Sequence, residues 1–203
     1  LPIAGLTALQ GLRDHGGVEA GARVLINGAS GGVGTYAVQL ARHFGAHVTG
    51  VCSGRNAQMV QELGAHQTID YTADDFTREA GAYDVVLDNV GNRSPRHVKR
   101  CLRPRGTWVI VSGPKNRVFG PLGYYLRASL SFAFSKRKAR FFFAEQRTHD
   151  LEFLARLAAQ QDIRSVVERV FSLDDIGDAF AHLETGRTRG KIVVAPRRTC
   201  ERT

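Results

Sequence analysis

Short apolar runs rich in β-branched residues alternate along most of this chain with segments whose apolar positions recur at helical spacing. The runs predict strands at Arg23–Asn27, His47–Cys52, Gln67–Asp70, Tyr83–Asp88 and Thr107–Val111. The intervening segments predict helices at Leu6–Leu12, Val33–Phe44, Asn56–Leu63, Asp74–Ala80 and Pro95–Leu102. This alternation predicts an α/β fold of the Rossmann type, a doubly wound parallel sheet with helices on both faces.

The rhythm changes after Gly113-Pro114. The stretch from Lys115 to Arg140 is rich in glycine, aromatic and basic residues, which predicts a surface loop with a short helix. We expect a last strand of the sheet at Phe141–Phe143 and a helix at Thr148–Gln160. The pattern then predicts a strand at Val166–Phe171, a helix from Leu173 to about Leu183 and a closing strand at Gly190–Ala195.

A glycine cluster follows the first predicted strand and opens the next helix. The run Gly28-Ala-Ser-Gly-Gly-Val-Gly34 comes directly after Val24–Ile26. Glycine permits a tight turn and a close approach of the backbone to a pyrophosphate, and a helix N-terminus offers free N–H groups to that anion. Because strand, loop and helix come in the required order, the sequence predicts a dinucleotide-binding site here.

The end of the second predicted strand carries no carboxylate. In this fold an acidic residue roughly 20 positions past the glycine loop binds the ribose of NAD, yet no Asp or Glu stands between Glu19 and Glu62. Ser53 and Arg55 stand there instead, and a hydroxyl and a guanidinium suit the 2′-phosphate of NADP. NADPH is therefore the expected cofactor, with a solvated Arg55 as the alternative interpretation.

The net charge of +9 is unevenly distributed. From Asn89 to Ala144 there is no acidic residue but thirteen lysines and arginines, whereas the rest of the chain has fifteen basic and nineteen acidic residues. Such a field attracts a phosphorylated cofactor or an anionic membrane surface. No recognition motif accompanies the charge, so no nucleic-acid partner is expected.

The cysteines and the first residue bear on the compartment. Cys52, Cys101 and Cys200 lie far apart in no metal-ligand spacing, which favours reduced thiols and a cytoplasmic location. The chain starts at Leu1 and its single methionine is Met59, so we expect it to be part of a longer product, and organellar targeting stays open. No apolar stretch approaches the ~20 residues of a membrane-spanning helix.

Several motifs together resemble the medium-chain dehydrogenase/reductase superfamily. They are Ala29-Ser-Gly-Gly-Val-Gly34, Cys52-Ser-Gly-Arg-Asn56, Leu63-Gly-Ala65, Ile69-Asp-Tyr71, Asp88-Asn-Val-Gly91 and Arg189-Gly-Lys-Ile-Val-Val194. More narrowly, the chain from Leu1 to about Pro196 is similar to zinc-independent quinone oxidoreductases, including the reticulon-interacting type. That family places a GroES-like domain before its Rossmann domain, and the resemblance implies that this chain lacks it.

The resemblance also implies a division of the chain and a set of cofactor-binding positions. The parts are a hinge helix (1–15), an NADP-binding Rossmann domain (16–163) and a C-terminal return segment (164–203) that would pack on the missing domain. The implied positions are Thr7, Ala29, Ser30, Gly31, Gly32, Val33, Gly34, Ser53, Arg55, Tyr71, Asn89, Val90, Ser112 and Gly113. Tyr71 is as readily a partly buried aromatic at a strand end, and Thr7 as readily a helix cap.

The resemblance implies hydride transfer from NADPH to a small electron acceptor, a quinone or an α,β-unsaturated carbonyl, without zinc. Zinc-containing members carry a cysteine ligand four residues before Thr7, where this chain has Ile3, so no metal is expected. The catalytic residues stay unassigned. Asp88 and His97 are the nearest titratable candidates for a proton donor, and a structural role is the alternative for both. The competing function is a non-catalytic NADPH-binding or membrane-surface interaction module.

Two further partners are expected. The strand at Phe141–Phe143 would pair with its copy in a homodimer, as in this superfamily, because an unpaired apolar edge invites aggregation. The basic and aromatic stretch Tyr124–Arg140 would lie on an anionic membrane, or else form a substrate-side flap, which is the favoured interpretation.

Overall fold

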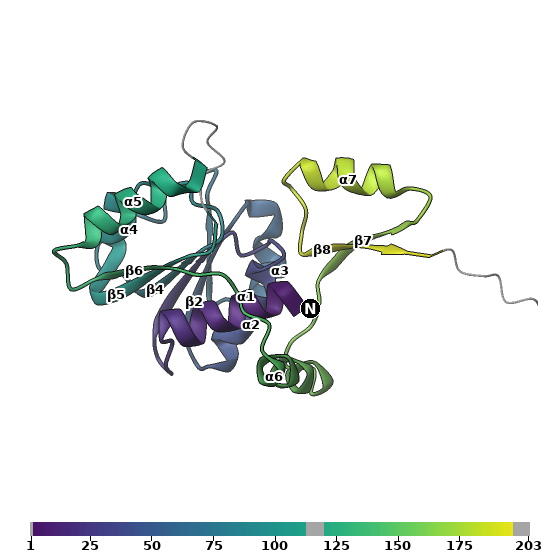
Figure 1. Cartoon of the computed structure of the whole chain (residues 1–203), viewed down its shortest axis with the longest axis horizontal. Helices are drawn as coiled ribbons and strands as arrows, with labels where there is room; N and C mark the ends of the chain where they lie inside the picture. The colour runs from purple at the N-terminus through teal and green to yellow at the C-terminus, as the bar shows by residue number, and fades with distance from the viewer. Residues whose placement is uncertain (1, 113–119, 197–203) are drawn as a thin grey trace, which may run out of the picture.

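In the computed structural model, which describes residues 2–112 and 120–196, six parallel strands form one sheet in the order β3-β2-β1-β4-β5-β6 (Figure 1). The strands are β1 (Arg23–Asn27), β2 (His47–Cys52), β3 (Gln67–Asp70), β4 (Tyr83–Asp88), β5 (Leu102–Ile110) and β6 (Lys138–Phe141). The first four coincide with the predicted bounds, and the predicted Rossmann-type fold is confirmed. The strand order reverses between β1 and β4, the position at which sheets of this kind bind ligands.

Helices cover both faces of the sheet. One face carries α1 (Pro2–Gln10) with its π-helical continuation η1 (Gly11–Gly16), α2 (Gly34–His43), α3 (Ala57–Glu62) after the 3-10 turn η2 (Gly54–Asn56), and α6 (Thr148–Ala159). The other carries α4 (Pro95–Cys101) and α5 (Gly120–Phe132). Within β1, Val24 and Ile26 pack into the first cluster and Leu25 into the second. Burial on both faces explains why β1 reads as an unbroken apolar run.

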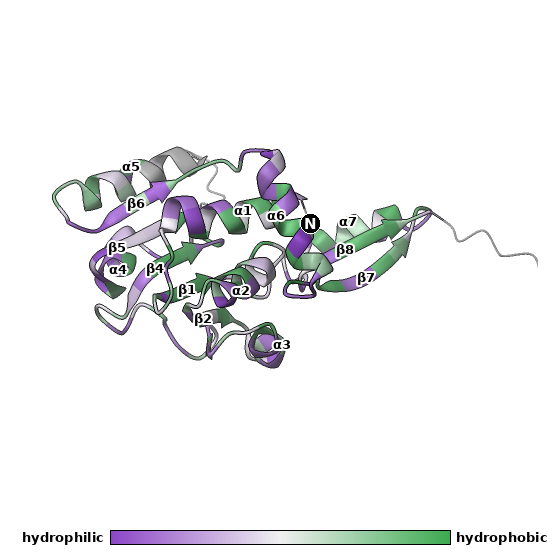
Figure 2. Cartoon of the chain, turned by 90° about the horizontal axis from the view of Figure 1, so that it is seen from below, coloured by the Kyte–Doolittle hydropathy of each residue, from purple (hydrophilic) through white to green (hydrophobic). Residues whose placement is uncertain are grey.

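The C-terminal residues form a small unit beside the sheet. It comprises β7 (Val167–Ser172), α7 (Ile176–Glu184) and β8 (Lys191–Ala195), with β7 and β8 paired in parallel (Figure 1). Large apolar side chains of this unit are exposed, and β8 is coloured hydrophobic along most of its length (Figure 2). They include Val170, Leu173, Phe180 and Leu183. An apolar surface of this kind is typical of an interface, and packing on a GroES-like domain remains a prediction.

Two predicted elements are wrong. Residues 74–80 form turns instead of a helix, because carboxylates bind nearby backbone N–H groups: Asp70 Oδ1 accepts from Thr72 N at 2.9 Å and Asp75 Oδ1 from Thr77 N at 3.0 Å. Such local bonds compete with the helical ladder. The last strand ends at Phe141 instead of beginning there. Phe142 leaves the sheet and stacks on His15, with ring centroids 4.2 Å apart.

The region between β5 and β6 holds more helix than the sequence indicates. Helix α5 spans 13 residues and buries Ala128 and Phe132 against Trp108, whereas Leu126 and Leu130 are exposed. Residues 113–119, on which the predicted loop also falls, lie outside the described residues. Among the helices that the structure describes, none combines the length and apolarity required to cross a bilayer.

Candidate functional site

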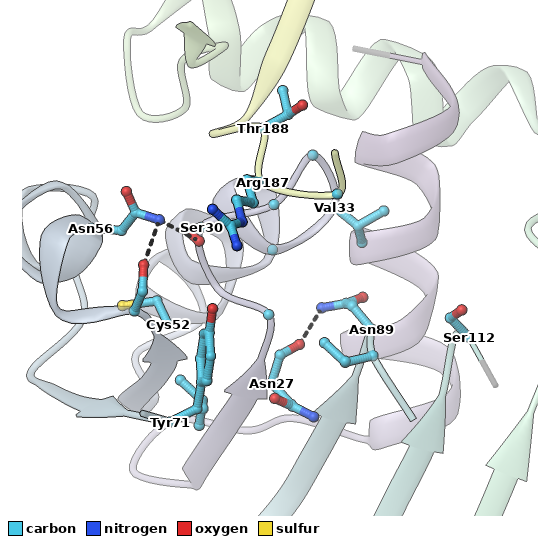
Figure 3. Close-up of a pocket in the computed structure, with 18 of the residues that line it drawn as sticks. Asn27, Ser30, Val33, Cys52, Asn56, Tyr71, Asn89, Ser112, Arg187 and Thr188 are labelled. Atoms are coloured by element: carbon cyan, nitrogen blue, oxygen red, sulfur yellow. Dashed lines mark hydrogen bonds between the residues drawn. The ribbon is translucent and has the colours of Figure 1, made fainter. Parts of the chain in front are cut away.

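A cleft of about 580 Å³ opens at the carboxyl ends of β1, β2 and β4 (Figure 3). The loops after these strands line it, together with Tyr71 after β3 and Ser112 after β5. A loop of the C-terminal unit, residues 186–188, also lines it. The cleft therefore lies at the switch point of the sheet, where the diverging connections leave room for a ligand.

The glycine run builds one wall of this cleft. Gly28 has a φ of +78°, which L side chains rarely adopt, and its N–H donates to the Val51 carbonyl at 3.1 Å. A Cβ at Gly34, the first residue of α2, would collide with the Gly28 carbonyl oxygen. A Cβ at Gly32 would lie 2.7 Å from Lys191 Nζ. The run thus brings a helix N-terminus and an ammonium group together, an arrangement that suits a phosphate.

The end of β2 forms the neighbouring wall. Asn56 Nδ2 donates to Ser30 Oγ at 3.1 Å and to Ser53 Oγ at 3.2 Å, so this side chain joins the glycine loop to the β2–α3 connection. Arg55 Nη2 donates to the Arg187 carbonyl at 3.2 Å. Tyr71, 52% exposed, follows β3 and faces into the cleft (Figure 3). These residues place hydroxyl, amide and guanidinium donors on one side.

A carboxylate does lie behind this wall, at Asp70 on the end of β3. Its Oδ1 accepts from the backbone N–H and the hydroxyl of Thr72, at 2.9 and 2.7 Å. These bonds, with one from the Gly54 N–H, lower the pKa of Asp70. Asp70 is not among the described residues that line the cleft, and none of these is acidic. Its carboxylate accepts hydrogen bonds from the backbone N–H groups of Gly54 and Thr72 and so stabilises the loop around Gly54.

Asp88 organises the opposite side of the cleft. Asp88 Oδ1 accepts from Asn27 Nδ2 at 2.8 Å, Gly91 N at 2.9 Å and Val90 N at 3.1 Å, and Oδ2 accepts from the Trp108 indole at 3.3 Å. Burial raises the pKa of Asp88, and these hydrogen bonds oppose the shift. The side chain is fully buried and its four described partners are all donors. Its geometry supports the structural alternative to a proton donor, since it fixes the loop that follows β4.

That loop and β5 supply the remaining lining residues. Asn89 Nδ2 donates to the Asn27 carbonyl at 3.0 Å, and Val90 and Ser112 also border the cleft (Figure 3). His97, the second candidate for a proton donor, lies on α4 outside the cleft, with its Nδ1 3.1 Å from Ser94 Oγ. His97 therefore has a local helix-capping environment and no position at the cleft.

Most of the predicted cofactor-binding positions come together in this cleft. They are Ser30, Gly31, Gly32, Val33, Gly34, Ser53, Arg55, Tyr71, Asn89, Val90 and Ser112. Ala29 is instead fully buried beneath the loop, and Thr7 Oγ1 donates to the Ile3 carbonyl of its own helix at 2.7 Å. Gly113 lies outside the described residues.

Residues that border this cleft or its glycine loop but were not assigned from the sequence include Asn56, Arg187 and Lys191. The signal for the last two is the motif Gly186-Arg-Thr-Arg-Gly-Lys191, a turn sequence before the closing strand that carries three cations. Because this motif lies far from the glycine loop along the chain, the sequence does not indicate that the two are in contact.

The residues that line the cleft fit a dinucleotide. Two guanidiniums, the N-terminus of α2 and the space left by glycines match a phosphorylated ligand. Within residues 2–112 and 120–196, no group of three or more His, Cys, Asp or Glu side chains is placed to hold a metal. Fold and site together define a dinucleotide-binding domain of the Rossmann type.

Similarity to known proteins points to the same class. A family model described as zinc-binding dehydrogenase matches residues 63–194. The trans-enoyl reductase pgmF of Aspergillus terreus is 36% identical over 203 positions, which cover 94% of this chain and 56% of that protein. The mouse mitochondrial NAD(P)H oxidoreductase RTN4IP1 is 33% identical over 213 positions, covering 96% and 54%. The quinone oxidoreductase structure from Coxiella burnetii matches with a TM-score of 0.84 at 33% identity, covering 97% and 59%.

This chain belongs to the zinc-binding dehydrogenase family, within the medium-chain dehydrogenase/reductase superfamily. The resemblance drawn from its motifs is therefore confirmed. The chain spans a little over half the length of the relatives it matches.

Proposed function

We propose that this chain is the cofactor-binding part of an NADPH-dependent oxidoreductase that reduces a quinone or an α,β-unsaturated carbonyl without zinc. The observation that carries the proposal is the cleft itself: a glycine loop at a helix N-terminus, with Arg55 on the adjoining wall and no carboxylate among the lining residues that the structure describes. Relatives named as NAD(P)H oxidoreductase, quinone oxidoreductase and enoyl reductase support nicotinamide-dependent reduction.

The preference for NADPH rests on charge at the end of β2. A carboxylate at this point would accept hydrogen bonds from an unmodified ribose and repel a 2′-phosphate. Ser53 and Arg55 are donors, and the planar guanidinium of arginine matches a phosphate with two parallel hydrogen bonds. Asp70, the nearest carboxylate behind this wall, is occupied by the backbone and hydroxyl of Thr72.

The nicotinamide cofactor supplies the hydride when bound. In this proposal the chain orients it. The helix N-terminus at Gly34 and the nearby Lys191 hold the diphosphate, and the loop of Asn89 and Val90, fixed by Asp88, borders the nicotinamide end. Such positioning contributes to catalysis by holding the reacting atoms together and excluding water. Ile3 supports zinc independence, because isoleucine cannot coordinate a metal at the position where zinc-containing members have a cysteine.

Parallel fluorescence titrations with NADPH and NADH test the proposal. We expect tighter binding of NADPH, and loss of that preference in Arg55→Ala by roughly 10- to 100-fold, the equivalent of one charge-assisted hydrogen bond of about 1.5–3 kcal/mol. Arg96→Ala, which removes an exposed guanidinium on α4, is the matched control. Equal affinity of the unmodified chain for both nucleotides would overturn the NADPH assignment.

A turnover assay distinguishes the proposed enzyme from a non-catalytic NADPH-binding module. With the chain in its full-length context, we expect NADPH oxidation in the presence of a quinone or an enone that is unaffected by a zinc chelator. NADPH binding without turnover of any such acceptor would instead support the non-catalytic binding module.

A further inference from the structure

The loop between α7 and β8 brings a second arginine to the cofactor cleft. Gly186, Arg187 and Thr188 line the cleft together with residues of the glycine loop and the β2–α3 connection. Figure 3 shows the Arg187 side chain pointing into the cleft, near Ser30 and on the same side as Tyr71. The loop belongs to the C-terminal unit, so this guanidinium reaches the site from outside the six-stranded sheet.

Backbone contacts hold the loop in this position. Gly190 N donates to the Ser30 carbonyl at 2.8 Å, and the Arg187 carbonyl accepts from Arg55 Nη2 at 3.2 Å. Gly190 itself has a φ of +62°, and a Cβ there would collide with the Val166 carbonyl oxygen. The loop is therefore placed by its main chain, and the Arg187 side chain is not required to hold it.

The side chains of the loop differ in their partners. Arg189 binds Glu168, through its N–H at 3.0 Å and its Nε at 3.4 Å. The guanidinium of Arg187 is exposed and has no hydrogen bond or ion pair with any part of the chain that the structure describes. One arginine of the loop thus has a structural partner and the other is directed into the cleft without one.

Among the described residues, the charged side chains that line the cleft are Arg55 and Arg187, and both are positive. The carboxylate of Asp70 lies behind the wall, where it accepts from the backbone and hydroxyl of Thr72. Two guanidiniums in one cleft repel each other unless an anion lies between them, and a phosphate can accept paired hydrogen bonds from both. The hydroxyls of Ser30, Ser53 and Tyr71 lie in the same cleft and add neutral donors.

We propose that Arg187 determines the cofactor specificity of this site: with Arg55 it binds the 2′-phosphate of NADPH, from the C-terminal unit. This inference rests on the proposed function, and assigns part of the NADPH preference to a residue 132 positions away from Arg55. A consequence is that the 2′-phosphate ties the C-terminal unit to the sheet, so that binding of NADPH, more than of NADH, protects the loop 186–190.

Equilibrium titrations of NADPH and NADH against Arg187→Ala and Arg187→Gln test the assignment. We expect the Kd for NADPH to rise about tenfold and the Kd for NADH to stay within twofold, because the two nucleotides differ by the 2′-phosphate alone. Arg96→Ala is the control for the loss of one positive charge elsewhere. Circular dichroism establishes that each variant is folded, and the glutamine variant preserves most of the side-chain volume.

The outcomes are distinct. An unmodified chain that does not prefer NADPH overturns the proposed NADPH dependence, and this assignment with it. A preference that survives in both Arg187 variants overturns the assignment alone. An equal loss of affinity for NADPH and NADH also overturns it, since Arg187 would then serve a part common to both nucleotides. Hydrogen exchange provides the second readout: adenosine 2′,5′-bisphosphate should slow exchange at residues 186–190 in the unmodified chain but not in Arg187→Ala.

Discussion

Replacement of Asp88 tests how the cleft is held open on the side formed by the loop after β4. The carboxylate is fully buried and accepts four hydrogen bonds, from two backbone N–H groups, the Asn27 amide and the Trp108 indole. In Asp88→Ala the two backbone N–H groups and the indole lose this acceptor, and Asn27 Nδ2 keeps its bond to Asn92 Oδ1 at 3.1 Å. Because one unsatisfied buried donor costs about 1–3 kcal/mol, we expect a loss of about 4 kcal/mol or more, a large fraction of the stability of a domain.

Asp88→Asn separates the contributions. An asparagine can keep the three bonds made by Oδ1 and turn its amide nitrogen toward Trp108, where donor would face donor across the present 3.3 Å contact. We expect this variant to lose about 1–3 kcal/mol. Trp108→Phe removes the opposing N–H, so the double variant should be more stable than the sum of the two single changes predicts, by about 1 kcal/mol.

The assay is urea unfolding followed by far-UV circular dichroism. Fluorescence is unsuitable for the comparison, because Trp108 is the single tryptophan of the chain. NADPH affinity is measured on the same variants, and should fall in Asp88→Ala because Val90 and Gly91 lose a fixed anchor. Stability of Asp88→Ala within about 0.5 kcal/mol of the unmodified chain, or strict additivity in the double variant, would refute the reasoning.

The remaining predictions concern the C-terminal unit and the sheet edge. Hydrogen bonds from His182 and Arg189 outweigh the burial of Glu168 and lower its pKa. Glu168→Gln should therefore reduce Tm at pH 7. The difference in Tm should decrease as the pH falls below about 4.5 and should vanish below the lowered pKa of Glu168, because the glutamate of the unmodified chain is then neutral, as glutamine is. At the edge, β6 has no strand partner on its outer side within the described residues, and Phe143 is 93% exposed. Light scattering should find a homodimer that Phe143→Asp weakens at least tenfold without lowering Tm.

Both tests have internal controls. Glu152→Gln changes an exposed glutamate on α6 and should leave Tm the same at either pH. A Tm difference for Glu168→Gln that persists unchanged to pH 3 would show that the glutamate charge is not what stabilises the unit. A monomeric unmodified chain at micromolar concentration would show that the expected pairing through the β6 edge is wrong.

Local pattern predicted most of the sheet and part of the site. β1, β2, β3 and β4 follow from short apolar runs, because strands buried on both faces need continuous hydrophobic sequence. The glycine run could be interpreted for the same reason: its function depends on immediate neighbours, a strand before it and a helix after it. The pattern gave a wrong prediction at residues 74–80, where a helix was expected and turns are found. There the carboxylates of Asp70 and Asp75 accept hydrogen bonds from nearby backbone N–H groups, and such bonds compete with those of a helix.

The sequence by itself determined the fold class, the position of the glycine loop and the absence of a carboxylate at the end of β2. Only the tertiary structure decided what else surrounds that loop. Asp88 became a buried acceptor because β1, β4 and β5 bring their donors to it. Arg187 and Lys191 reached the glycine loop because the C-terminal unit folds back beside α2. Contacts between residues more than a hundred positions apart depend on chain topology, and no local periodicity encodes them.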